Sequence, residues 1–309
     1  MKKSVKKLTK ERPKIIVILG PNASGKSALG VGLAKKFSGE IISADSRQVY
    51  RGLDIGTGKI TKREMAEIRH HLLDVASPKR VFTVAQYQKL AQAVLEDILR
   101  RGKLPIIVGG TGLYIDALLY NTPFPAVPPN PKLRQKLEKE SSESLFKKLE
   151  RLDPDRAANI DPKNKRRLVR ALEIVLATAK PVPALIRANK GINDFRVLKI
   201  GIALPEEKLK DGIARRLEQR IKTGMIREVK KLRERGLTWK RLEELGLEYR
   251  YTARHLQGLL SREEMIQKLE IEIWRYAKRQ MIWFKRDKNI IWLSDLKKAF
   301  PIIQDFLGR

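Results

Sequence analysis

Residues 14–27 read KIIVILGPNASGKS, and this stretch decides the fold. It opens with Ile15 to Leu19, an unbroken apolar run rich in β-branched residues, which is typical of a strand buried on both faces of a parallel sheet. The spacing G-x-x-x-x-G-K-[ST] comes next. It comprises Gly20, Pro21, Asn22, Ala23, Ser24, Gly25, Lys26 and Ser27. We expect a helix from Lys26 to about Phe37, and a strand–loop–helix context makes this spacing a predicted phosphate site.

The residue types in this loop suit an anion. Glycines allow backbone N–H groups to turn inward, and a helix N-terminus adds its dipole. Lys26 supplies a positive charge, and the Ser27 hydroxyl can bind Mg²⁺. A nucleoside triphosphate and another diphosphate both satisfy this chemistry, so the ligand class stays open at this point. The alternative is a glycine-rich turn without a special role.

Strand-like and helical segments alternate along the first 120 residues. Ile41–Ala44 and Pro105–Val108 are predicted strands, and Val84–Arg101 is a predicted amphipathic helix. Strand character returns at residues 195–204, and Ile290–Leu293 is a candidate late strand. This alternation predicts an α/β fold of the P-loop nucleotide-kinase type, a parallel sheet flanked by helices.

Polar residues follow two of these strands. Asp45 comes directly after the second strand, and Gly109-Gly110-Thr111-Gly112 follows the third. Ligands of open α/β sheets bind beyond the carboxyl ends of the strands, so both segments are expected near the phosphate loop. Asp45 is then a candidate general base or Mg²⁺ ligand, the alternative being a capping aspartate. Thr111 and its neighbours could hold a second phosphate, the alternative being a plain turn.

Composition divides the chain into parts. Residues 1–13 form a basic tail, either a disordered terminus or a nucleic-acid-binding arm. Residues 121–131 carry five prolines and read as a hinge. Residues 132–180 are helical and highly charged, so 121–195 is predicted to be a helical insertion. The catalytic core is then made of residues 14–120 and 196–309.

Charge and residue types exclude several classes of protein. There are 66 Lys and Arg against 35 Asp and Glu, a net charge of +31, which calls for an anionic partner such as nucleic acid or polyphosphate. The absence of cysteine excludes disulfides and thiolate zinc sites, and three histidines make a histidine metal site improbable. No apolar run approaches the ~18 residues of a membrane span. With no export signal either, we expect a cytoplasmic protein and, by default, a monomer.

Seven blocks, in this order, resemble the tRNA isopentenyltransferase (tRNA dimethylallyltransferase) family of the bacterial type. They are GPNASGKS (20–27), ADSRQVYRGLDIGTGK (44–59), HHLLDV (70–75), FTVAQYQ (82–88), PIIVGGTGLYIDALL (105–119), NKRRLVRALE (164–173) and YAKRQMIWFKRD (276–287). The DSRQVY and GGTGLY blocks are far more specific than the phosphate loop alone. The resemblance implies transfer of a dimethylallyl group from dimethylallyl diphosphate to N6 of adenosine 37 in the tRNA anticodon loop, with Mg²⁺ as cofactor.

The resemblance also implies roles for individual residues. Asp45, Thr111, Arg216 and Lys26 would be catalytic, with the aspartate as general base and Arg216 on the diphosphate; a shift of that role onto Arg215 or Arg220 stays open. Ser27 and Asp45 would hold the metal. The expected tRNA contacts are Asp45, Ser46, Arg47, Gln48, Arg134, Arg166, Arg167, Leu168, Val169, Arg170, Lys278, Arg279 and Gln280. Trp283 and Phe284 are core residues by spacing, with stacking on anticodon bases as the alternative.

Three other functions compete with this one. A P-loop kinase of small molecules would share the loop, although it needs neither the +31 charge nor DSRQVY. An isopentenyltransferase acting on free adenine nucleotides would not need the insertion or the basic late helices. An RNA-binding protein with an inactive loop would bind tRNA without modifying it.

Overall fold

A computed structural model describes residues 12–183 and 194–308. The chain divides into two compact units, residues 1–121 with 189–309, and residues 122–188. We call them the core unit and the insertion. The expected insertion at 121–195 has nearly these limits, although its return segment at 184–193 and most of the basic tail lie outside the described residues.

A six-stranded parallel sheet forms the centre of the core unit, with the strand order β3-β2-β4-β1-β5-β6. The strands are β1 Lys14–Leu19, β2 Gly39–Ser43, β3 His70–His71, β4 Leu104–Gly109, β5 Arg196–Ile202 and β6 Ile290–Leu293. β1 lies between β4 and β5, and its residues Ile15–Leu19 are all buried. The unbroken apolar run therefore marks an inner strand, as expected.

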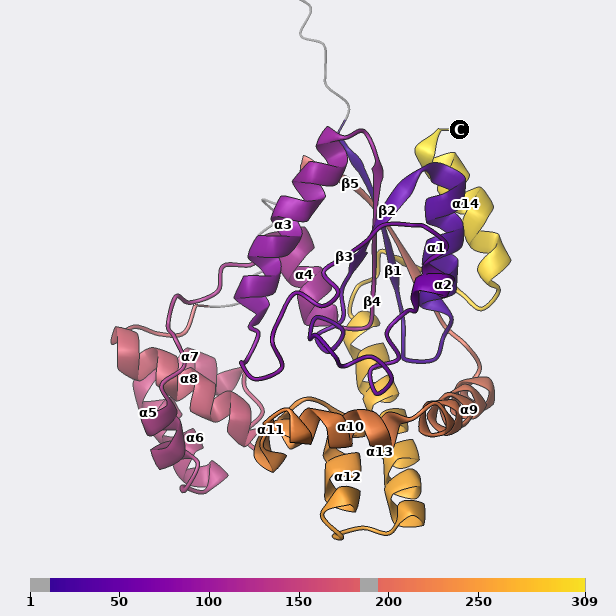
Figure 1. The fold of residues 1–309 in the computed structure, drawn as a ribbon. Coiled ribbons are helices and arrows are strands. Elements are labelled where there is room, and N and C mark those ends of the chain that lie inside the picture. Colours follow the sequence, from indigo (N-terminus) through magenta and orange to yellow (C-terminus); the bar gives the residue numbers. More distant parts are fainter. Residues whose placement is uncertain (1–11, 184–193, 309) are drawn as a thin grey trace, which may run out of the picture. The chain divides into compact units, whose positions relative to one another are not determined.

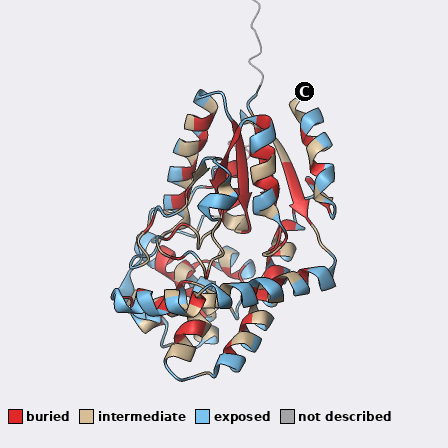
Figure 2. Ribbon diagram, turned by 45° about the vertical axis from the view of Figure 1, so that its right-hand side comes forward, coloured by how far each residue is buried: buried red, intermediate tan, exposed pale blue. Residues whose placement is uncertain are grey.

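Helices cover both faces of this sheet (Figure 1). Ile16 and Ile18 pack on the side of α1 (Lys26–Phe37) and α14 (Ala299–Leu307). Alternate residues such as Val17 pack on the side of α3 (Val84–Arg100) and α4 (Gly112–Tyr120). Figure 2 shows the strands as buried between helices whose outer sides are exposed. Each fully buried aliphatic side chain contributes roughly 1.5–3 kcal/mol to stability, so the doubly covered sheet is the rigid base of the site.

The later helices of the core unit gather near the edge at which the strands end (Figure 1). They are α9 Glu206–Lys222, α10 Met225–Glu234, α11 Trp239–Glu244, α12 Leu247–Leu256 and α13 Arg262–Phe284; the short elements are α2 Lys62–Met65 and η2 Leu296–Lys298. A capping box of Ser261 and Glu264 starts α13. Its buried positions recur every three or four residues, and the one polar side chain among them is Gln280.

The insertion has a core of its own. Its helices are α5 Pro131–Leu137, α6 Ser142–Leu152, α7 Pro154–Ala158 and α8 Lys165–Thr178. Leu145, Leu149, Leu168 and Leu172 are at its centre. Asp153 ends α6 and caps α7 by accepting a hydrogen bond from the N–H of Arg156, which separates the two helices at Asp153-Pro154.

The structure confirms the predicted fold class and adds one strand. His70-His71, which is not among the predicted strands, forms the edge strand β3 beside β2. His71 Nε2 lies 2.7 Å from a carboxylate oxygen of Glu40, which also pairs with Arg101. A two-residue strand is too short for a periodic signal, so only its pairing reveals it. Within the described ranges no helix is both long and apolar enough to cross a bilayer.

Candidate active site

The phosphate loop joins β1 to α1 in a tight turn. Gly20 has a φ of +149°, and a side chain there would place its Cβ 2.9 Å from the carbonyl oxygen of Ile202. Gly25 precedes α1 with a φ of +89° and leaves the helix without a side-chain cap. The first N–H groups of α1 are therefore available to an anion, and the helix dipole favours negative charge there.

The side chain of Lys26 folds back towards the phosphate loop. Its Nζ donates to the carbonyl oxygen of Pro21 and lies 3.5 Å from the Ser24 hydroxyl. Burial and, to a smaller extent, the positive charge of Arg216 lower the pKa of Lys26 to about 7, against the opposing effect of the Asp45 charge. An anion placed between the two cations would restore the charged ammonium, as expected of a phosphate site.

The loops after β2 and β4 are joined to each other. Thr111 Oγ1 accepts a hydrogen bond from the N–H of Ser46 at 3.0 Å, and the N–H of Thr111 donates to the carbonyl oxygen of Ala44 at 3.1 Å. Asp45 Oδ1 accepts from the N–H groups of Arg47 (2.8 Å) and Gln48 (3.3 Å). Its Oδ2 has no hydrogen-bond partner in the described part of the chain. Asp45 Oδ1 therefore caps the turn that follows this residue, and Oδ2 remains available to accept a proton or to bind a metal ion.

A concavity beside the phosphate loop carries two arginines of α9. Arg216 and Arg220 line it together with Asn22 and Ala23. Arg220 pairs with Glu248 at 2.8 Å and donates to the carbonyl oxygen of Gly56 at 3.1 Å.

Arg216, by contrast, has no hydrogen-bond or ion-pair partner among residues 12–183 and 194–308. Partial removal of water by the surrounding protein and the positive charge of Arg220 lower the pKa of Arg216, although the Arg216 side chain remains accessible to solvent. Arg215 is exposed and does not line the concavity. Of the three candidates, Arg216 is the one with an unneutralised guanidinium in the site.

Comparison with known proteins places this geometry in a family. Residues 48–287 match the family described as IPP transferase. The chain belongs to the IPP transferase family. It is 43% identical to the tRNA dimethylallyltransferase of Pelotomaculum thermopropionicum over 91% of this chain and 90% of that protein. It is 45% identical to tRNA dimethylallyltransferase 2 of Treponema denticola, covering 89% and 92%.

Solved structures of the IPP transferase family have the same fold. The tRNA isopentenylpyrophosphate transferase of Bacillus halodurans is 37% identical with a TM-score of 0.71, covering 96% of each chain. A eukaryotic dimethylallyltransferase described as acting on tRNA is 28% identical with a TM-score of 0.77, covering 96% of this chain and 80% of that one. The family that the sequence blocks predicted is confirmed.

Within this IPP transferase fold, the last predicted block of tRNA contacts separates into two groups. Lys278 and Arg279 are exposed on α13, and the Lys278 ammonium lies 5.4 Å from the ring centre of Trp274. Gln280, however, is 5% exposed, so its predicted contact with tRNA is corrected: its side chain binds the Asn22 amide and the Gly110 carbonyl. The sequence does contain a signal for this role, because Gln280 is a polar residue at a position where the helical periodicity of α13 predicts burial.

The aromatic pair after it belongs to the packing of the core unit. Phe284 is buried, and Trp283 Nε1 donates to Asp116 at 3.2 Å while its ring lies against Gly112. Stacking on anticodon bases, the alternative considered from the sequence, is not what these two side chains do in this structure.

The basic block of α8 likewise contains residues in different environments. Arg166 and Arg167 are exposed, whereas Leu168 and Val169 are in the insertion's apolar core, which corrects their predicted tRNA contacts. Arg134 and Arg170 both bind the buried carboxylate of Glu173 at 2.5–2.8 Å. Although burial raises the pKa of Glu173, hydrogen bonds from Arg134, the Asn130 amide and Arg170 hold it at about 2.

The predicted metal ligands suit Mg²⁺ bound together with a diphosphate. In the described ranges, no group of three or more histidine or acidic side chains could hold a metal by itself. Ser27 is exposed in the first turn of α1, and Asp45 keeps one carboxylate oxygen without a partner. Mg²⁺ typically takes one or two protein oxygens and fills its octahedron with phosphate oxygens and water, so this donor set fits the ion.

Proposed function

We propose that the chain transfers a dimethylallyl group from dimethylallyl diphosphate to N6 of adenosine 37 in the tRNA anticodon loop and releases diphosphate. One observation carries the proposal: the phosphate loop with Lys26, the free guanidinium of Arg216 and Asp45 converge at one edge of the sheet. Relatives named tRNA dimethylallyltransferase, 38–45% identical over about 90% of the chain, support it.

The diphosphate of the prenyl donor would lie on the phosphate loop. Loop amides, the Lys26 ammonium and the Arg216 guanidinium stabilise the negative charge that grows as the C–O bond to diphosphate breaks. Ser27 would hold Mg²⁺, which supplies further charge neutralisation when it is bound. Asp45 has one free oxygen, which cannot bind the metal and take a proton at the same time, and we assign it to the proton.

The adenine amine is a weak nucleophile, and it needs a carboxylate to take its proton. As the new C–N6 bond forms, Asp45 Oδ2 accepts that proton, while Oδ1 keeps the carboxylate oriented through the Arg47 and Gln48 amides. The Thr111 hydroxyl holds the same loop through Ser46. Anticodon-loop bases are single-stranded, so moving one out of its stack costs little.

The remaining positive charge of the protein suits the binding of tRNA, a polyanion. Exposed cations such as Arg166, Arg167, Lys278 and Arg279 would bind tRNA phosphates, which gives salt-dependent and largely sequence-independent affinity. The monomeric state and cytoplasmic location stay predictions from the sequence.

The deciding experiment offers the protein Mg²⁺, ATP, labelled dimethylallyl diphosphate and either tRNA, AMP or no acceptor, followed by mass spectrometry of the nucleosides. We expect N6-dimethylallyladenosine in tRNA alone. Label in AMP would instead support the free-nucleotide enzyme. ATP-dependent phosphoryl transfer without prenylation would support the kinase, and tRNA binding without any product would support the RNA-binding protein.

A further inference from the structure

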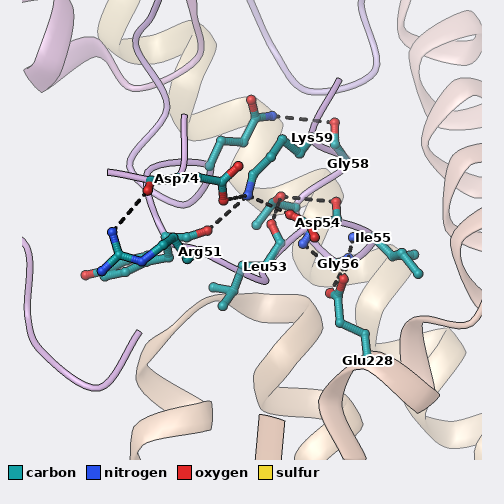
Figure 3. Close-up of polar contacts among 12 residues, drawn as sticks. Arg51, Leu53, Asp54, Ile55, Gly56, Gly58, Lys59, Asp74 and Glu228 are labelled. Carbon is teal, nitrogen blue, oxygen red and sulfur yellow. Dashed lines mark hydrogen bonds and ion pairs between the residues drawn. The ribbon is translucent and has the colours of Figure 1, made fainter. Parts of the chain in front are cut away.

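One carboxylate holds the loop that follows the DSRQVY block. Glu228, on α10, accepts hydrogen bonds from three consecutive N–H groups: Asp54 at 3.0 Å, Ile55 at 2.7 Å and Gly56 at 3.0 Å (Figure 3). The Tyr249 hydroxyl donates to the same carboxylate at 2.7 Å. Four donors therefore converge on one side chain.

A carboxylate side chain meets this requirement. Its two oxygens accept several hydrogen bonds and donate none, whereas an amide would present an NH₂ group to at least one of the four donors. The N–H groups of Ile55 and Gly56 are largely shielded from water, so losing the carboxylate would leave them unsatisfied.

Lys59 fixes the other end of the loop. Its Nζ donates to the Tyr50 carbonyl at 3.0 Å, to Asp54 at 2.7 Å and to Asp74 at 2.5 Å (Figure 3). The Lys59 side chain is only 6% exposed. Glu228 and Lys59 thus leave the segment from Asp54 to Gly58 little freedom to move.

The far side of this segment faces the site. The Gly56 carbonyl accepts from Arg220 at 3.1 Å, and the Gly58 carbonyl accepts from Gln48 at 3.5 Å. A Cβ built on Gly58 would lie 2.3 Å from an Arg220 nitrogen and 2.9 Å from an Arg216 nitrogen, so the backbone there touches both guanidinium groups. A shift of this segment would break the contact of Arg220 with the Gly56 carbonyl, change the space beside Arg216 and release the side chain of Gln48 beside Asp45.

We propose that Glu228 is a positioning residue for the diphosphate site: by fixing Asp54–Gly58 it places Arg216 and Arg220 beside the phosphate loop. The inference rests on the proposed function for the ligand, and it adds a residue that lies outside the concavity. Displacement by about 1 Å of groups that orient a reacting ligand can cost on the order of 100-fold in rate, so the effect is measurable.

The test measures binding of inorganic diphosphate with Mg²⁺ by calorimetry to wild type and to Glu228→Gln. We expect the affinity to fall about tenfold or more. The control is Glu234→Gln, an exposed glutamate on the same helix, which should bind as wild type does. Thermal melts check the folded state, and Glu228→Asp, which keeps the charge on a shorter side chain, carries the test if Glu228→Gln does not fold.

A double-mutant cycle separates positioning from general support of the fold. In an Arg216→Ala background, Glu228→Gln should weaken diphosphate binding by a smaller factor than it does in the wild-type background, because one of the two groups it positions is gone. Unchanged affinity in Glu228→Gln, or full additivity in a folded double mutant, would overturn the inference. Diphosphate binding does not depend on turnover, so absence of tRNA prenylation by wild type would refute the proposed function alone.

Discussion

The Oε1 atom of Gln280 accepts a hydrogen bond from the N–H of Asn22 at 3.0 Å, which joins α13 to the phosphate loop across 258 residues of sequence. The Nε2 atom of the same side chain donates to the carbonyl oxygen of Gly110 at 2.8 Å. One buried amide therefore ties the loop after β1 to the loop after β4. Exposed cations flank it at Lys278 and Arg279, so α13 has one surface for solvent and another for the site.

Replacing Gln280 by Met should weaken diphosphate binding and spare tRNA binding. The substitution keeps the length of the side chain but leaves a buried N–H and a buried carbonyl unpaired, at a cost of about 1–3 kcal/mol each. Calorimetry with diphosphate and filter binding with tRNA measure the two affinities. Gln267→Met, at an exposed position of α13, is the control. Loss of tRNA affinity with unchanged diphosphate affinity would restore the original assignment of Gln280.

Asp45→Asn should abolish most of the chemistry while keeping the structure. The amide oxygen can still cap the Arg47 and Gln48 amides, but it cannot take the proton of the adenine amine. General-base removal typically costs 10²–10⁴-fold, so we expect a loss of about that size in single-turnover prenylation. Affinity for tRNA should stay within about twofold. A rate within about threefold of wild type would show that Asp45 is not the base.

Diphosphate binding should depend on pH through Lys26. Because burial and the charge of Arg216 lower the pKa of Lys26 to about 7, the free protein loses this ammonium as the pH rises through 7. A bound diphosphate raises that pKa again, so binding near pH 8 takes up a proton and affinity falls as pH rises.

Calorimetry in buffers of different ionisation enthalpy measures the uptake. The control is Lys26→Arg, whose guanidinium stays charged, and it corrects for the protons of diphosphate itself. Equal proton uptake by wild type and Lys26→Arg would contradict the role given to Lys26.

Glu173→Gln should destabilise the insertion by about 3–5 kcal/mol, because it leaves Arg134 and Arg170 without their shared buried carboxylate. Hydrogen exchange of the α5 and α8 peptides measures this locally, with exposed Glu150→Gln as control. The folded pKa of Glu173 is about 2 against an ordinary 4.5. Its stabilisation is therefore complete above pH 4.5 and is lost as the pH falls towards 2, so wild type and variant should converge in acid.

Arg166→Ala with Arg167→Ala should weaken tRNA binding and lower its salt dependence. Each phosphate contact contributes about 0.9 to the slope of log affinity against log salt on a duplex and about 0.7 on a single strand, so the slope should fall by up to about two. Exposed Lys35→Ala on α1 is the control. An unchanged slope would mean that this face of α8 is merely solvated.

The features that rest on local signals could be predicted from the sequence. The apolar run at Ile15–Leu19 and the glycine loop act over neighbouring residues, so strand, loop and helix followed directly. Asp45 and Thr111 followed as well, because parallel strands deliver their carboxyl ends to one edge.

The surroundings of each charged or polar side chain, by contrast, became clear from the folded structure alone. From the sequence, Gln280, Arg134 and Arg170 are all expected tRNA contacts. In the structure Gln280 binds Asn22, 258 residues away, and both arginines meet on the buried carboxylate of Glu173. It likewise distinguished Arg216 from Arg220, since the ion pair with Glu248 is formed by Arg220. Periodicity shows which face of a helix is buried, but the free energy of a buried polar group depends on the partner that folding brings to it.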